Sequence, residues 1–284
     1  MTQKRCWKKH KAGLEKNELL RACLKRIHPD DPDNYRDREA KNSMDMTGNT
    51  TQNTSKTKTL TVFIITIILG YILFIIPDIF FGITKIGGGK IGINLLYIAL
   101  FQLLSVTALL YLSLKILKKD FKYIGLRFEN LGKDILSGAC FGVLWTILQF
   151  VFIIPNTGGI NRPDIYDMSA MYDGSLAGTL SFVALGVIGG GITEELFNRG
   201  YFINILKDVF KNPKTGLWIS AILSIILFAL GHLPVSVLDW FDILVPTIMY
   251  TLLFLFTKRL TASIVAHGIY NMSAIILTYY MYFK

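Results

Sequence analysis

Seven apolar stretches follow one another from about residue 60 to the carboxyl end of the chain, and they constrain the fold more than any other feature. A helix needs about 20 predominantly apolar residues to cross a hydrocarbon core of about 30 Å. The fifth and sixth stretches are short, so six or eight crossings are alternatives to seven. We predict an all-α fold, a polytopic membrane bundle of about seven transmembrane helices. The stretches are 60–82, 92–115, 134–154, 176–198, 216–232, 242–257 and 261–282.

Charge divides the chain into two parts. Residues 1–58 hold 14 of the 30 Lys and Arg residues and 8 of the 20 Asp and Glu residues. The chain as a whole is 52% hydrophobic and 18% charged, which is too apolar and too poor in charge for an ordinary soluble domain. We therefore predict a polar, basic tail over residues 1–58 and a transmembrane domain over residues 59–284.

The tail itself has two parts. Four aliphatic residues at helical spacing predict a short amphipathic helix over residues 11–28. The polar stretch 29–58 is rich in Asn, Asp, Thr and Ser and predicts a disordered or loosely ordered linker. Met44 and Met46 lie in it, and translation from either is an alternative to a start at Met1.

The basic residues also predict the orientation of the bundle. After residue 58 most of them fall in the second, fourth and sixth loops, whereas the loop before the fourth stretch holds Arg162 alone. The positive-inside rule then places the amino terminus in the cytoplasm and the carboxyl terminus outside, in an integral protein of the cell membrane. Because the net charge of +10 is explained in this way, we expect the lipid bilayer and not nucleic acid as a partner.

Ionisable residues inside apolar stretches are costly and indicate function. The fourth stretch continues as GVIGGGITEELFNRGYF, with Glu194 and Glu195 adjacent and Arg199 four residues after Glu195. On a helix this spacing places Glu195 and Arg199 on one face, close enough for an ion pair. Gly186 and Gly190 precede them as a GxxxG pair, which predicts that a neighbouring helix approaches closely.

Two later stretches each carry a histidine with a partner four residues away. Phe228 and His232 end the fifth, and His267 and Asn271 lie in the last. Taken singly, each motif is also explained by structural hydrogen bonds between helices. Taken together, the motifs provide a carboxylate base, an arginine, two imidazoles and an amide donor. Hydrolysis of a peptide bond needs such a set, because it requires a base to deprotonate water and donors to stabilise an oxyanion.

The order EExxxR, FxxxH and HxxxN on late membrane helices resembles the CAAX prenyl protease and bacteriocin-processing family, also called CPBP or Abi. The resemblance covers residues 60–284 and implies an intramembrane endopeptidase. It implies that Glu194 and His232 activate water and that His267 and Asn271 bind the oxyanion. It further implies that Glu195 and Arg199 position the carboxylates.

The resemblance allows either of two mechanisms. The family is described as metalloproteases, and a zinc ion would take Glu194, His232 and His267 as ligands with water in the fourth position. The spacing HExxH is missing from the sequence, and we favour hydrolysis without a metal. No pair of the three cysteines is closely spaced, which argues against a zinc knuckle or a disulfide framework.

The expected substrate is a membrane-anchored peptide or protein. The alternative function is a non-catalytic immunity or scaffold protein that uses the same polar faces to bind a partner. A proton-coupled transporter is a third possibility, because buried Glu and His also form proton relays. The first three stretches contain no repeat of the Glu or His motifs, and this argues against a transporter.

Overall fold

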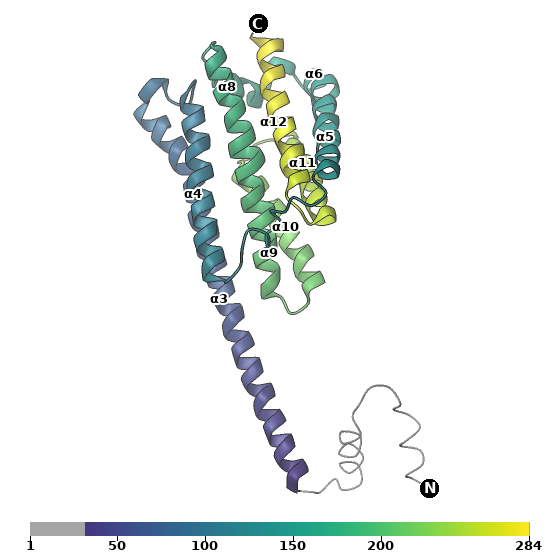
Figure 1. Cartoon of the computed structure of the whole chain (residues 1–284). Coiled ribbons are helices and arrows are strands. Elements are labelled where there is room, and N and C mark those ends of the chain that lie inside the picture. The colour runs from purple at the N-terminus through teal and green to yellow at the C-terminus, as the bar shows by residue number, and fades with distance from the viewer. Residues whose placement is uncertain (1–31, 284) are drawn as a thin grey trace, which may run out of the picture. The chain divides into compact units, whose positions relative to one another are not determined.

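The computed structural model describes the backbone of residues 32–283 and side chains from Ser55 onward. The amphipathic helix predicted over residues 11–28 lies outside the described residues. Every regular element in the described part is a helix, as the sequence predicts (Figure 1). The principal helices are α3 (Pro32–Thr84), α4 (Asn94–Ile116), α5 (Leu131–Ile147), α7 (Pro163–Ser169), α8 (Leu176–Ala184), η4 (Leu185–Phe202), α9 (Ile203–Leu206), α10 (Pro213–Gly231), α11 (Val237–Thr257) and α12 (Thr261–Tyr282).

Seven helical segments are long and apolar enough to span a membrane, so the predicted number is confirmed for the described residues. Large apolar side chains, such as Leu104 and Phe256, are exposed on these segments, as expected for helices that face lipid. The chain is therefore an integral membrane protein. The segments are Ser55–Thr84, Asn94–Ile116, Leu131–Asn156, Leu176–Val209, Pro213–Gly231, Val237–Thr257 and Thr261–Tyr282.

Several predicted boundaries differ from the structure. The fourth span continues to Val209, well beyond residue 198. It can do so because the amides of Asn198 and Asn204 bond to carbonyl oxygens of the same helix, four residues earlier. The linker predicted over 29–58 also differs, since α3 is helical from Pro32. A helix that an apolar span has already nucleated gains one backbone hydrogen bond for each residue added.

Contacts within the chain divide it between Lys56 and Thr57, and the second unit contains the bundle. The largest apolar core of this unit lies where η4 meets α3 and α4, and it includes Phe63, Val106 and Phe197. Thr66, Ser113 and Tyr201 form a chain of buried hydrogen bonds across the same three helices. The core and this chain of bonds together fix η4, the helix that carries the two glutamates.

The last helix, α12, packs closely against α5 and η4 because glycines line both neighbours. A Cβ at Gly138 of α5 would lie 2.4 Å from the carbonyl oxygen of Ala262. On η4, a Cβ at Gly191 would lie 2.9 Å from the Cα of Gly268. The close helix approach predicted from the glycines before the glutamates is thus present, and α5 provides a second glycine face.

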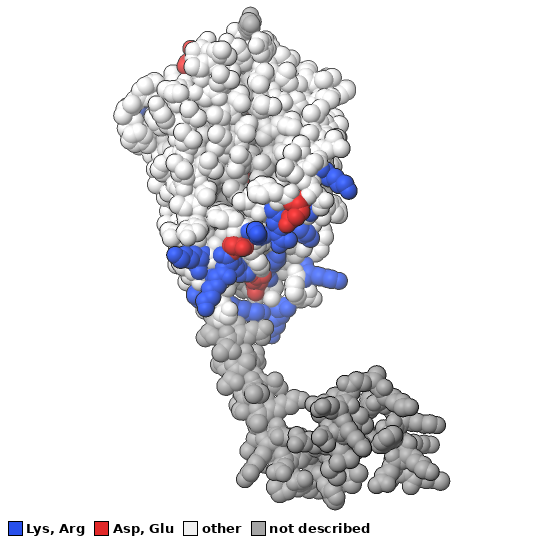
Figure 2. Space-filling view, viewed as in Figure 1, with Lys and Arg blue, Asp and Glu red and all other residues white. Residues whose placement is uncertain are grey.

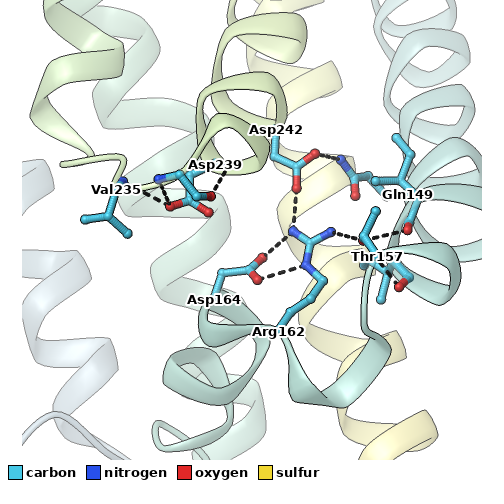
Figure 3. A network of polar contacts seen from close by, with 10 residues as sticks. Gln149, Thr157, Arg162, Asp164, Val235, Asp239 and Asp242 are labelled. Atoms are coloured by element: carbon cyan, nitrogen blue, oxygen red, sulfur yellow. Dashed lines mark hydrogen bonds and ion pairs between the residues drawn. The ribbon is translucent and has the colours of Figure 1, made fainter.

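A buried polar network ties the loop before α7 to α11 (Figure 3). Arg162 bonds both carboxylate oxygens of Asp164, and it also bonds Thr157 and Asp242. Gln149 donates to the other oxygen of Asp242, at 2.7 Å. The Arg162 side chain is only 2% exposed, and these acceptors compensate its burial.

The charged side chains of the described residues gather toward one end of the face drawn in Figure 2, and most of that face is uncharged. Lys119, Lys207 and Lys258 are electrostatic neighbours in this region, which joins the second, fourth and sixth loops. The basic loops therefore meet in space. On which side of the membrane this end lies stays a prediction.

Candidate active site

The two adjacent glutamates lie on η4, a π-helical stretch in which hydrogen bonds join residues five apart. In addition to these backbone bonds, the Thr193 hydroxyl donates to the carbonyl oxygen of Ile188 at 2.7 Å. Arg199 Nη1 lies 3.0 Å from Glu195 Oε1, and both side chains are almost fully buried. The ion pair predicted from the spacing of these two residues is present.

His267 brings α12 to the same carboxylate. Its Nδ1 lies 3.0 Å from Glu195 Oε1, the oxygen that also contacts Arg199. An ionised carboxylate can only accept hydrogen bonds, so Nδ1 carries the proton of this bond. Nε2 is then the ring nitrogen that remains for other partners. One face of the His267 ring stacks on the Tyr250 ring of α11, with the ring centroids 4.7 Å apart and the ring planes at 19°.

Asn271 lies one turn after His267 and donates to the carbonyl oxygen of Gly186 at 2.9 Å. Gly190 lies between the two motif side chains. A Cβ at Gly190 would be 2.5 Å from Asn271 Nδ2 and 3.6 Å from His267 Nε2. The missing side chain of Gly190 thus allows the Asn271 amide and the His267 imidazole to approach the backbone of η4 closely.

Glu194 differs from its neighbour. Its Oε2 is buried and has no hydrogen-bond partner within residues 55–283. Glu195, in contrast, holds both Arg199 and His267. Oε2 of Glu195 is also unpaired, so the difference between the two carboxylates is that Oε1 of Glu195 is held by two cationic or hydrogen-bonding partners in the described residues. Different surroundings of paired carboxylates commonly accompany different chemical roles.

His232, the last residue of the predicted fifth stretch, lies directly after the end of a helix. The helix α10 finishes at Gly231, and His232 Nδ1 bonds the Phe228 carbonyl oxygen at 2.9 Å. Pro234, which follows, cannot continue the helix. The Phe228 ring lies 4.5 Å from the His232 ring and 4.3 Å from the Arg199 guanidinium carbon. Phe228 thus connects the second motif to the first.

The set proposed for zinc is not assembled as a ligand cluster. No group of three His, Cys, Asp or Glu side chains in the described part of the chain is placed to hold a metal ion. Because Nδ1 of His267 bonds Glu195 and Nδ1 of His232 bonds a carbonyl, only Nε2 of each ring remains. The side chains as placed do not fit the predicted Glu194, His232 and His267 set, and we derive no step through a metal.

The sequence analysis missed two tyrosines near the glutamates. Tyr250 stacks on His267, and the charges of Glu194 and Arg199 act on the Tyr71 hydroxyl of α3. Neither tyrosine belongs to a motif, and an aromatic residue in an apolar span looks like core or lipid-facing surface. The spacing of residues within one helix cannot reveal these neighbours, because each tyrosine meets a helix that is distant in the sequence.

Residues 176–273 match the family model described as Rce1-like, type II CAAX prenyl endopeptidase. The matched segment begins at the start of α8 and contains all three motifs, with Asn271 near its end. No curated protein and no solved structure matches the chain significantly. The match confirms the resemblance to the CAAX protease family that the motifs indicate.

Proposed function

We propose that this membrane protein, whose residues 176–273 match the CAAX prenyl endopeptidase family model, cleaves a peptide bond of a membrane-anchored substrate with a water activated by Glu194. The observation that carries the proposal is the contrast between the two glutamates. Oε2 of both carboxylates is buried without a hydrogen-bond partner among the described residues, but only Glu195 has Arg199 and His267 on its other oxygen, Oε1. A buried carboxylate oxygen with no partner is suited to take a proton from water.

In this mechanism Glu194 removes one proton from water, and the hydroxide oxygen forms a bond to the carbonyl carbon of the substrate. The carbonyl oxygen becomes an oxyanion near Gly190, where the Asn271 amide would be a donor. The C–N bond then breaks, and the proton held by Glu194 passes to the leaving amine. The resemblance assigns His232 to water activation, and Nε2 is its nitrogen still free for that role.

Glu195 and Arg199 would act indirectly. Their ion pair and the hydrogen bond that His267 Nδ1 donates to Glu195 fix the imidazole so that Nε2 lies near Gly190. The Asn271 amide, on the same helix as His267, would then be the donor that the substrate oxygen meets. Orienting a histidine through a buried carboxylate is a common device of hydrolases.

The test compares Glu194→Gln with Glu195→Gln. Both variants and the wild type are reconstituted in liposomes that contain a library of membrane-anchored peptides, and products are identified by mass spectrometry. We expect no products from Glu194→Gln, with the midpoint of thermal unfolding unchanged. Glu195→Gln should lose stability as well, by about 3–5 kcal/mol, because Arg199 would remain buried without its charge partner.

Two outcomes would contradict the proposal. Cleavage by Glu194→Gln at the wild-type rate would remove Glu194 from the chemistry. Absence of products from a correctly inserted wild type would favour the non-catalytic partner-binding alternative. Products from the wild type alone would identify the cut site and give the first information on the substrate.

A further inference from the structure

Tyr71 of the first span has a hydroxyl that packing does not explain. The hydroxyl is buried and has no hydrogen-bond partner within residues 55–283. The ring meets Phe197 of η4 edge-on, with centroids 5.6 Å apart and planes at 86°. Phe74 contacts the same Phe197 ring in the same manner. A phenylalanine at position 71 would fill this aromatic site equally well, so the oxygen needs another reason.

The position of the ring brings this oxygen to the candidate site. Tyr71 Cε1 lies 3.5 Å from where a Cβ of Gly231 would be, and Gly231 directly precedes His232. Phe197, whose ring Tyr71 contacts, lies three residues after Glu194 on η4. Tyr71 therefore lies between η4 and the end of α10, at the level of the first two motifs.

The unpaired hydroxyl and the unpaired carboxylate oxygen complement each other. A tyrosine hydroxyl donates one hydrogen bond, and an ionised carboxylate only accepts them. Glu194 Oε2 is an acceptor that is buried and unpaired in the same described region. Burying either atom without a partner costs free energy that a single bond, direct or through one water molecule, would recover.

We propose that Tyr71 is a positioning residue of this protease, whose hydroxyl holds the Glu194 carboxylate, directly or through the reacting water, in the orientation that takes up the proton. The inference rests on the proposed function. It assigns a role in the chemistry to the first span, which carries none of the three motifs and lies outside residues 176–273.

The test is Tyr71→Phe, which removes the hydroxyl and keeps the ring. We expect kcat to fall about tenfold to a hundredfold, the effect of losing a hydrogen bond to a charged group, with KM within about twofold of the wild type. The midpoint of thermal unfolding should stay the same or rise, because a buried atom without a partner in the resting protein is removed. A role in folding alone would leave kcat unchanged.

Tyr201→Phe is the matched control. The Tyr201 hydroxyl is also buried, but it bonds Ser113 at 2.5 Å and lies outside the proposed machinery. Its loss should lower the midpoint of unfolding and leave kcat unchanged. If Tyr71→Phe cleaves at the wild-type rate while Glu194→Gln is inactive, this inference alone is overturned. If the folded wild type cleaves nothing, the proposed function fails and the inference fails with it.

Discussion

Asn271 offers a small target for a test of oxyanion stabilisation, since its amide nitrogen and His267 Nε2 are the two nitrogens nearest to the position of a Cβ at Gly190. We expect Asn271→Ala to lower kcat by about a hundredfold to a thousandfold, about 3–4 kcal/mol, with little change in KM, because an oxyanion donor acts mainly in the transition state. Steady-state cleavage of the peptide identified in the liposome assay would measure both constants.

Asn204→Ala is a suitable comparison. Asn204 is buried on α9, donates to the carbonyl oxygen of Gly200 on η4 at 2.8 Å and accepts a bond from Lys207, and neither partner is a motif residue. Both variants lose an amide bonded to a backbone oxygen, so a difference in kcat would isolate the catalytic contribution. An equal effect of the two substitutions would assign Asn271 a structural role.

At the residue scale, the sequence predicts what spacing along one helix can express. The Glu195–Arg199 pair was predictable because the two residues lie four apart. The bond between Glu195 and His267 was not, since it joins residues 72 apart and depends on how η4 and α12 pack. Tyr71 carries no formal charge, and so it did not stand out within its apolar span.

Among the elements, α12 depends most on neighbours without side chains. We expect Gly191→Ala to lower the free energy of unfolding by about 1–3 kcal/mol, because the added Cβ would lie 2.9 Å from the backbone of Gly268 and the helices would have to separate. Cleavage should fall too, since separation moves His267 away from Glu195. Thermal unfolding in detergent and the liposome assay measure the two effects.

Gly132→Ala provides the contrasting change. Gly132 is in the first turn of α5, and no atom lies within 4 Å of the Cβ that would be added. Alanine there should stabilise the protein by about 0.5–1 kcal/mol, since it restricts the unfolded chain and favours the helix. Equal stability changes at positions 132 and 191 would mean that the contact with α12 is not tight.

At this scale the sequence predicts the number of spans and their order, and it is less exact about their ends. The sixth span begins at Val237 and not at residue 242, because Ser236 and Asp239 form a capping box that starts the helix in polar residues. The π-helical register of η4 could not be predicted. Composition determines which residues a span contains, whereas packing against neighbours selects its hydrogen-bond register.

For the whole molecule, the orientation in the membrane is the property to test. We expect a membrane-impermeant maleimide to label Asn161→Cys in intact cells and to leave Lys118→Cys unlabelled, in a variant whose three cysteines are replaced by serine. Both positions are exposed, one before the fourth span and one after the second. The prediction follows from the basic residues of the second, fourth and sixth loops.

Permeabilised cells control for reactivity, since both cysteines should then be labelled. Labelling of Lys118→Cys but not of Asn161→Cys in intact cells would show the opposite orientation. Labelling of both cysteines in intact cells would place both loops on the outer side of the membrane. It would contradict the topology, in which one span separates the two loops.

The glycine faces around α12 also affect how mutational tolerance in this chain should be interpreted. In a survey of all single substitutions scored by cleavage, the glycines at 138, 142, 186, 190 and 191 should be as depleted as the motif residues, although none carries a reactive group. Intolerance at these positions would measure the distance between backbones and not chemistry. Sensitivity to substitution would therefore outline the contact surface of α12. Only substitutions that preserve volume, such as glutamate to glutamine, would distinguish the residues that react from the glycines that allow close packing.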